Sequence, residues 1–109
     1  MRNKIIVEKM INYVNKVLSY PNGLDYRAFS DNIITVEACV FNLSQLGELT
    51  TKLDKDYTAN HSDIPWNEMR GLRNKIVHDY EGVNLKLVWE IVSEDLPELK
   101  YRLEELLRS

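Results

Sequence analysis

With 109 residues, of which 44% are hydrophobic and 28% charged, the chain has the length and composition of one soluble globular domain, which excludes an extended disordered protein. Its formal charge of -3, from 14 basic and 17 acidic residues, lacks the basic excess of a general nucleic-acid-binding protein, so any nucleic-acid site must be local. We expect a single domain over residues 1–109 and no intrachain disulfide, because Cys39 is the only cysteine.

The first expected helix begins near Lys4, where apolar residues start to recur at spacings of three and four, and it stops at the segment PNG, residues 21–23. A longer second helix is expected to follow a cap at Ser30 or Asp31 and to reach Leu53. Its apolar face is broad. This breadth predicts a central helix with more than one neighbour.

Two small residues lie inside this second helix. Cys39, within the apolar stretch VEACVF, is predicted to be a buried free thiol. Gly47, within QLGEL, weakens a helix by about 1 kcal/mol relative to alanine. We therefore expect another helix to approach closely at Gly47.

The polar segment DKDYTANHSD, residues 54–63, is expected to be a loop. A third helix is predicted from about Pro65 to about Tyr80, with Ser62 or Asp63 as its N-terminal cap. Gly82 lies where a C-terminal cap would end this helix.

The remaining segment, residues 83–109, is predicted to be helical in two pieces, with Glu94 or Asp95 capping the second piece and Pro97 opening it. Strand patterns and repeats are missing from the sequence. The start lacks the continuous hydrophobic segment of a signal peptide, and no apolar run reaches membrane-spanning length, which predicts a cytoplasmic protein. The expected fold class is all-α, a four- to five-helix bundle with up-down connections.

The end of the third helix contains RNKIVHDY, residues 73–80, with an arginine, a histidine and a tyrosine close together. At about 100° per residue, Met69, Leu72 and Ile76 share one side, predicted to face the core, and His78 lies on another side. Arg73 and His78 then diverge by about 140°. Either Arg73 reaches round, or the helix unwinds before His78, or a second copy completes the site.

If these groups converge, they suit phosphodiester cleavage in RNA without a metal ion. The guanidinium of Arg73 can bind a phosphate through two hydrogen bonds and neutralise its charge. His78 can accept or donate a proton near neutral pH, and Asn74 can orient it. One histidine cannot readily act as acid and base in the same step, so a symmetric dimer with two copies of His78 is expected. The bland alternative is a surface histidine beside a tyrosine, Tyr80, that only packs.

Other residues near this motif have two interpretations. Arg70 and Lys75 either contact RNA phosphates or are solvated surface charges. Trp66 either stacks on a base or packs in the core, the second being favoured. His61 lies in the polar segment without a motif around it.

The pattern Arg-x4-His-x-Tyr within IPWNEMRGLRNKIVHDYEGVN resembles the HepT-like branch of the HEPN (higher eukaryotes and prokaryotes nucleotide-binding) superfamily. The likeness extends to QLGEL in the second helix and to VWEIVSEDLPELK near the end. It therefore covers most of the chain.

This resemblance implies a HEPN-like bundle that forms a homodimer and acts as a metal-independent ribonuclease toxin, without a cofactor, in a type VII-like toxin-antitoxin pair. It implies that Arg73 and His78 are catalytic and that Asn74 supports them. It also implies that a minimal nucleotidyltransferase antitoxin silences the toxin by transferring AMP to Tyr80. The alternative function is a non-catalytic helical module that binds a nucleotidyltransferase or a nucleotide, with Arg73 and Tyr80 used for recognition.

Overall fold

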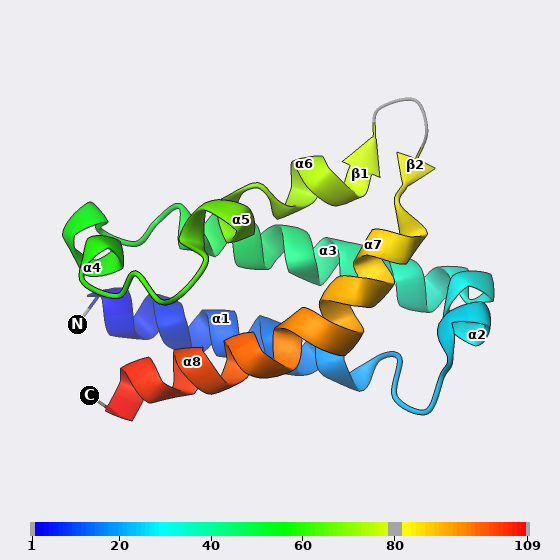
Figure 1. The fold of residues 1–109 in the computed structure, drawn as a ribbon, viewed down its shortest axis with the longest axis horizontal. Helices are drawn as coiled ribbons and strands as arrows, with labels where there is room; N and C mark the ends of the chain where they lie inside the picture. The colour runs from blue at the N-terminus through cyan, green and yellow to red at the C-terminus, as the bar shows by residue number, and fades with distance from the viewer. Residues whose placement is uncertain (1, 79–81, 109) are drawn as a thin grey trace.

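The computed structural model describes residues 2–78 and 82–108. Figure 1 shows α1, α3, the pair α5–α6 and the segment α7–α8 running alternately in opposite directions, as the predicted all-α bundle requires. The elements in chain order are α1 (Arg2–Ser19), α2 (Tyr26–Asp31), α3 (Ile33–Thr50), α4 (Lys55–Ala59), α5 (Trp66–Arg70), α6 (Leu72–Ile76), β1 (Val77–His78), β2 (Gly82–Val83), α7 (Leu85–Glu90), the π-helical turn η1 (Ile91–Asp95) and α8 (Leu96–Arg108).

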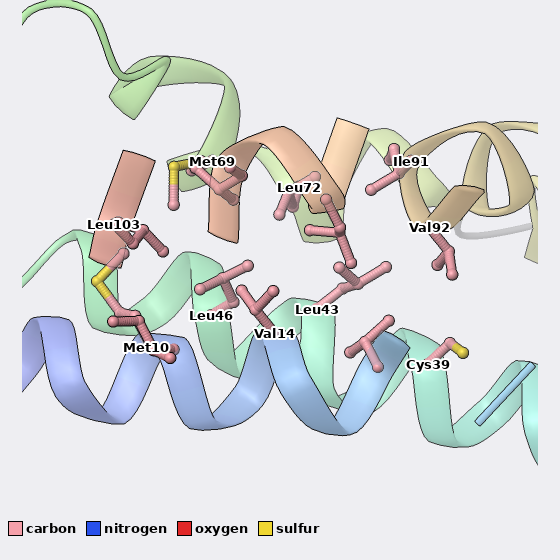
Figure 2. Close-up of a cluster of buried hydrophobic side chains, with 14 of the residues drawn as sticks. Met10, Val14, Cys39, Leu43, Leu46, Met69, Leu72, Ile91, Val92 and Leu103 are labelled. Carbon is pink, nitrogen blue, oxygen red and sulfur yellow. The ribbon is translucent and has the colours of Figure 1, made fainter. Parts of the chain in front are cut away.

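The core forms where α1 and α3 face α5, α6, η1 and α8. Figure 2 shows apolar side chains from these elements pointing toward one another. Each fully buried side chain of valine or leucine size contributes roughly 1.5–3 kcal/mol of transfer free energy. The residues labelled there are Met10, Val14, Cys39, Leu43, Leu46, Met69, Leu72, Ile91, Val92 and Leu103.

Helix α3 is the central helix, as predicted, since α1, α2, α5, α6 and α7 all pack against it. The N-terminal cap of α3 is not Ser30 or Asp31, as expected, but the next residue. Asn32 caps α3 by accepting a hydrogen bond from the Thr35 amide at 3.1 Å, and Ser30 and Asp31 belong to α2 instead. The short helix α2 forms there because Asp25 caps it through the Ala28 amide.

Gly47 lies where α5 approaches α3 closely, which confirms the predicted reason for a glycine there. A Cβ atom at this position would lie 2.6 Å from the backbone oxygen of Met69. Real Cβ atoms essentially never approach that closely, so any larger residue would push α5 away from α3. Gly47 therefore sets the distance between α3 and the segment that contains α6.

The region expected to be a loop followed by one long helix is organised differently. The polar segment contains the short helix α4, and the expected third helix is divided at Gly71 into α5 and α6. Pro65 occupies the N-cap position of α5 and has no side chain that can accept a hydrogen bond, so the predicted caps Ser62 and Asp63 are wrong. Backbone and side-chain contacts to the preceding turn hold this helix start instead; the Trp66 indole donates to the His61 carbonyl at 2.9 Å.

The C-terminal segment is one continuous helical run rather than two capped pieces. Residues Glu94 and Asp95 lie inside η1, which has no side-chain cap, so their predicted capping role is wrong. The Leu96 amide bonds to the Ile91 carbonyl, five residues earlier. Pro97 lacks an amide hydrogen and would crowd the carbonyl four residues before it in a regular α-helix, and the wider π turn accommodates it.

Cys39 is buried, as predicted, and burial raises the pKa of its thiol to about 11. A thiol with so high a pKa is protonated at neutral pH and is a poor nucleophile. Among the described residues, none of the helices combines the length and the hydrophobicity needed to cross a membrane.

Candidate functional site

The helix that contains the arginine ends at Ile76, before the histidine. Val77 is extended (φ -116°, ψ 120°), and β1 pairs antiparallel with β2 so that Val77 faces Val83 and His78 faces Gly82. The Ile76 carbonyl, which a continuing helix would pair with the amide four residues on, accepts the Asn84 amide at 2.8 Å. The expectation of a helix to Tyr80 with Gly82 as its cap is therefore wrong.

The sequence left open three ways to bring Arg73 and His78 together, and the end of α6 at Ile76 bears on one of them. The helix unwinds before His78, so the angles derived for a continuous helix do not apply to His78. The structure describes His78 through its backbone, in β1. Tyr80, the predicted modification site, lies outside the described residues.

Gly82 makes the return strand possible. Its φ of +78° lies in the left-handed region that residues with a Cβ atom rarely adopt. Gly82 pairs directly with His78, so its conformation determines how the backbone of His78 is placed relative to α6. Sequence reasoning assigned Gly82 a capping role and overlooked this pairing.

Asn84 is a further residue that sequence reasoning missed. Its amide binds the Ile76 carbonyl at the end of α6, and its side chain caps α7 by accepting the Leu87 amide at 3.1 Å. The signal was an asparagine directly before an apolar helical pattern. Asn84 thus joins the hairpin to both of its neighbouring helices.

Helix α6 presents its polar residues outward. Arg73, Asn74 and Lys75 are exposed, whereas Leu72 and Ile76 are buried and mark the side that faces the core, as predicted. At about 100° per residue, Arg73 and Lys75 lie about 80° to either side of that buried direction. The two cations therefore occupy opposite flanks of α6.

Lys75 borders a groove between α5–α6 and the segment α7–η1–α8. The groove has a volume of about 380 Å³. Arg102, on its far wall, forms ion pairs with Asp63 at 3.1 Å and Glu98 at 3.0 Å, and hydrogen bonds with these two carboxylates raise its pKa further. The lining residues are Pro65, Glu68, Met69, Leu72, Lys75, Leu87, Ile91, Asp95, Leu96, Glu98, Leu99 and Arg102.

Arg73 is absent from this groove and faces the other flank of α6. Within residues 2–78 and 82–108, its guanidinium has no hydrogen bond or ion pair in the protomer. Since no carboxylate of the described residues binds it, this exposed guanidinium can bind an external anion.

The remaining candidates lie in α5 or in the turn before it. Arg70 is half-buried and donates to the Asn67 side chain at 2.8 Å. Trp66 is buried, with 6% of its surface exposed, which confirms that it packs in the core. The ring centroids of His61 and Tyr57 lie 4.8 Å apart, and the two rings are tilted by 54°. Over the part of the chain that the structure describes, no three metal-ligating side chains of His, Cys, Asp or Glu gather in one place.

Comparison with known proteins identifies the family of the chain. The family model described as "Ribonuclease HepT-like" matches residues 10–106. The chain is 32% identical over 101 residues to "Putative RNase MJ1380" of Methanocaldococcus jannaschii, covering 93% of each chain. It is 34% identical over 86 residues to "Putative RNase TTE0752" of Caldanaerobacter subterraneus, covering 79% of this chain and 77% of the relative.

A third relative, "Probable ribonuclease HepT" of Thermococcus cleftensis, is 29% identical over 104 residues, which cover 95% of this chain and 94% of the relative. No solved structure matches the chain significantly. The family match extends from α1 through the hairpin to α8 and so includes α6 and the hairpin strands. The chain therefore belongs to the HepT-like ribonuclease family.

Proposed function

We propose that this protein is a metal-independent endoribonuclease in which Arg73 and His78 are catalytic and Asn74 supports them. The observation that carries this proposal is the exposed guanidinium of Arg73 on α6, which has no side-chain partner within residues 2–78 and 82–108 and lies one short turn before the strand that contains His78. Membership of the HepT-like ribonuclease family and the names of the relatives support RNA as the substrate.

In this mechanism the ribose 2′-oxygen attacks the adjacent phosphorus, and the bond from phosphorus to the 5′-oxygen breaks. An imidazole accepts the 2′-hydroxyl proton, and an imidazolium donates a proton to the leaving 5′-oxygen. Arg73 binds the non-bridging oxygens, where negative charge increases in the transition state. These steps need only the residues of the protein, and they leave a 2′,3′-cyclic phosphate on one fragment.

We also propose that the protein is cytoplasmic and that it acts as a homodimer, the second because of the two proton transfers. One imidazole is in the wrong protonation state for the second transfer within the same step, whereas two copies of His78 across one groove supply an acid and a base together. Arg70 and Lys75, on either side of Arg73 in sequence, are proposed to contact backbone phosphates outside the reacting group.

The test of this function is incubation of purified protein with RNA in the presence of EDTA. We expect fragments that end in 2′,3′-cyclic phosphate, because no step requires a divalent cation. Intact RNA combined with capture of a nucleotidyltransferase would contradict the proposal and favour a non-catalytic binding module.

A minimal nucleotidyltransferase is proposed as the antitoxin of a type VII-like pair, and AMP on Tyr80 is proposed to silence the ribonuclease. Tyr80 is two residues from His78, so the added phosphate introduces negative charge close to the substrate backbone and competes for the guanidinium of Arg73. We expect modified protein to cleave RNA at least about tenfold more slowly, a change of about 1.4 kcal/mol. The measurement is cleavage before and after AMP transfer, confirmed by mass.

The matched control is a Tyr80→Phe variant treated in the same way, which cannot accept AMP and should keep its activity. Circular dichroism should show the same helix content in modified and unmodified protein. Undiminished cleavage by fully modified protein would rule out this regulation.

The hairpin offers a test of positioning that leaves the catalytic groups in place. Gly82→Ala places a Cβ atom on a left-handed backbone opposite His78. Gly23→Ala is the control, because Gly23 also has a left-handed backbone but lies in a turn remote from the hairpin. At neither position would the added Cβ atom meet another atom within 4 Å. Each substitution should cost about 1–2 kcal/mol of unfolding free energy. Only Gly82→Ala should slow cleavage, by up to about 10²-fold. Equal activities of the two variants would show that the hairpin does not position His78.

A further inference from the structure

Three aromatic side chains meet where α2 packs against α7, the helix that follows the hairpin. The ring of Phe29 is fully buried, and its centroid lies 5.1 Å from that of the half-buried Trp89. The ring of Tyr26 lies 6.1 Å from Trp89 in an edge-to-face arrangement, and Tyr26 is 40% exposed. Burial of Phe29 explains why α2 packs on the core, but it does not explain why a second ring remains in solvent.

The two outer rings, Tyr26 and Trp89, form an aromatic platform whose orientation is fixed. Trp89 contacts both of the other rings, which restrict its side-chain torsions. Tyr26 begins α2, and the carboxylate of Asp25 holds this first turn by accepting the Ala28 amide at 2.8 Å. A ring that is already held in place loses little conformational freedom when a flat ligand stacks on it. The aromatic platform therefore suits a planar ligand.

Exposed cations flank the aromatic platform. Lys86 lies three residues before Trp89 and is its neighbour on the surface of α7, and Arg27 follows Tyr26 on α2. In the described part of the protomer neither cation forms an ion pair. The exposed Glu90 lies about 100° round α7 from Trp89, whereas Lys86 lies about 60° from it. Phosphates that flank a base on the platform can therefore be bound by the two cations.

This combination favours single-stranded RNA over a protein surface as the occupant. The centre of a protein interface is depleted of lysine and of carboxylates, whereas Lys86 and Glu90 both border these rings. Aromatic rings interleaved with cations are the arrangement that binds single-stranded nucleic acid, because the rings stack on bases and the cations bind phosphates.

The aromatic platform lies within a few nucleotides of the hairpin that contains His78. Gly82 pairs with His78, and β2 leads directly into α7, which begins at Leu85 (Figure 1). At about 3.3 Å per extended residue and about 1.5 Å per helical residue, the backbone from Gly82 to Trp89 spans at most about 16 Å. Stacked nucleotides follow one another at about 3.4 Å, so about five of them cover this distance. One RNA strand can therefore contact the hairpin and the platform together.

We propose that Tyr26, supported by Trp89, stacks on an unpaired base of the RNA a few nucleotides from the phosphodiester that is cleaved, and that Arg27 and Lys86 bind the neighbouring phosphates. This proposal rests on the proposed function and specifies its substrate. The RNA must be single-stranded at this position, because both faces of a base inside a duplex are already covered. Tyr26 and Trp89 are positioning residues: they hold the strand and transfer no proton.

The first measurement is the affinity of the full-length protein for a labelled, single-stranded 2′-O-methyl RNA, which lacks the 2′-hydroxyl that the proposed cleavage requires. Tyr26→Ala should weaken this binding by about 5- to 150-fold, the loss expected for one stacked base. Tyr26→Phe keeps the ring and should bind as wild type does. Tyr101→Ala is the matched control, because Tyr101 is also an exposed tyrosine but lies on α8. Circular dichroism should be the same for all three variants, and binding to a duplex of the same sequence should not depend on Tyr26.

A second measurement separates stacking from charge. In a set of these RNAs, each has one nucleotide replaced by an abasic one. Wild type should lose affinity at one or two positions, and Tyr26→Ala should show no further loss there, because the ring and the base belong to the same contact. Lys86→Ala should instead weaken binding to every RNA of the set and lower the salt dependence. With cleavable RNA, Tyr26→Ala should raise KM and leave kcat nearly unchanged.

The outcomes separate this proposal from the ribonuclease function. Binding by Tyr26→Ala that equals wild type would overturn the aromatic platform even if wild type cleaves RNA. An altered mass of Tyr26→Ala in solution, with unchanged affinity for RNA, would also overturn it and assign the rings to a protein contact. Binding that depends on Tyr26, together with no cleavage of ordinary RNA by wild type, would support the platform and contradict the ribonuclease function.

Discussion

Replacing His78 by alanine is expected to lower the rate of RNA cleavage by about 10²–10⁴-fold, because the variant loses the group that transfers protons in the transition state. The loss should appear in kcat rather than in KM, since an imidazole that only transfers protons contributes little to ground-state binding. The measurement is multiple-turnover cleavage of a labelled RNA in EDTA, with substrate concentration varied for each protein so that kcat and KM are obtained separately.

The control for this prediction is structural. His78 pairs with Gly82 through its backbone, which alanine retains, so the hairpin and the helix content should be unchanged by the substitution. His61→Ala is a matched variant, because it removes the other histidine of the chain, whose ring contacts that of Tyr57, and it should cleave RNA at the wild-type rate. Loss of activity in His61→Ala and not in His78→Ala would place the proton transfer elsewhere.

Arg73→Ala is expected to lower cleavage by about 10²–10³-fold, because the variant lacks the donors that stabilise charge on the phosphate in the transition state. Arg73→Lys should recover only part of this loss, since an ammonium supplies the charge without the planar pair of donors. Unfolding free energies should stay within about 0.5 kcal/mol of wild type, because Arg73 is exposed and has no partner among the described residues.

Lys75→Ala provides the comparison on the same helix. Lys75 is also an exposed cation but lies on the opposite flank of α6, beside the groove toward α8. Its loss should weaken binding modestly and reduce the dependence on salt rather than remove catalysis. Equal losses from Lys75→Ala and Arg73→Ala would show that general positive charge, and not a specific phosphate contact, explains the activity.

The helices that were predicted well are those whose pattern is strongly periodic. Helix α1 and the central helix α3 follow from apolar residues at spacings of three and four, and the role of Gly47 follows from the cost of a glycine inside a helix. The caps were harder to predict. Ser30, Asp31 and Asn32 are all good capping residues, and α2 takes the first two because Asp25 starts a short helix before them.

At the candidate site, local sequence patterns predicted which residues of α6 are buried but not where α6 ends. The burial of Leu72 and Ile76 followed from helical spacing, but the end of α6 depends on a backbone hydrogen bond to Asn84, eight residues after Ile76. Gly82 adopts a positive φ that suits either a helix cap or a hairpin, and only the pairing with His78 distinguishes the two. The backbone pairing of residues 76–78 with residues 82–84, which local helical spacing does not reveal, ends α6 within the Arg-x4-His-x-Tyr motif.

The most direct test of the central claim, that Arg73 and His78 act together on one phosphodiester, is a double-mutant cycle measured by RNA cleavage in EDTA. Residues that act as one catalytic unit show strongly non-additive losses. We predict that the double variant of Arg73→Ala and His78→Ala cleaves RNA about as slowly as the slower single variant. Wild-type cleavage by either single variant, or losses that multiply in the double variant, would contradict the account.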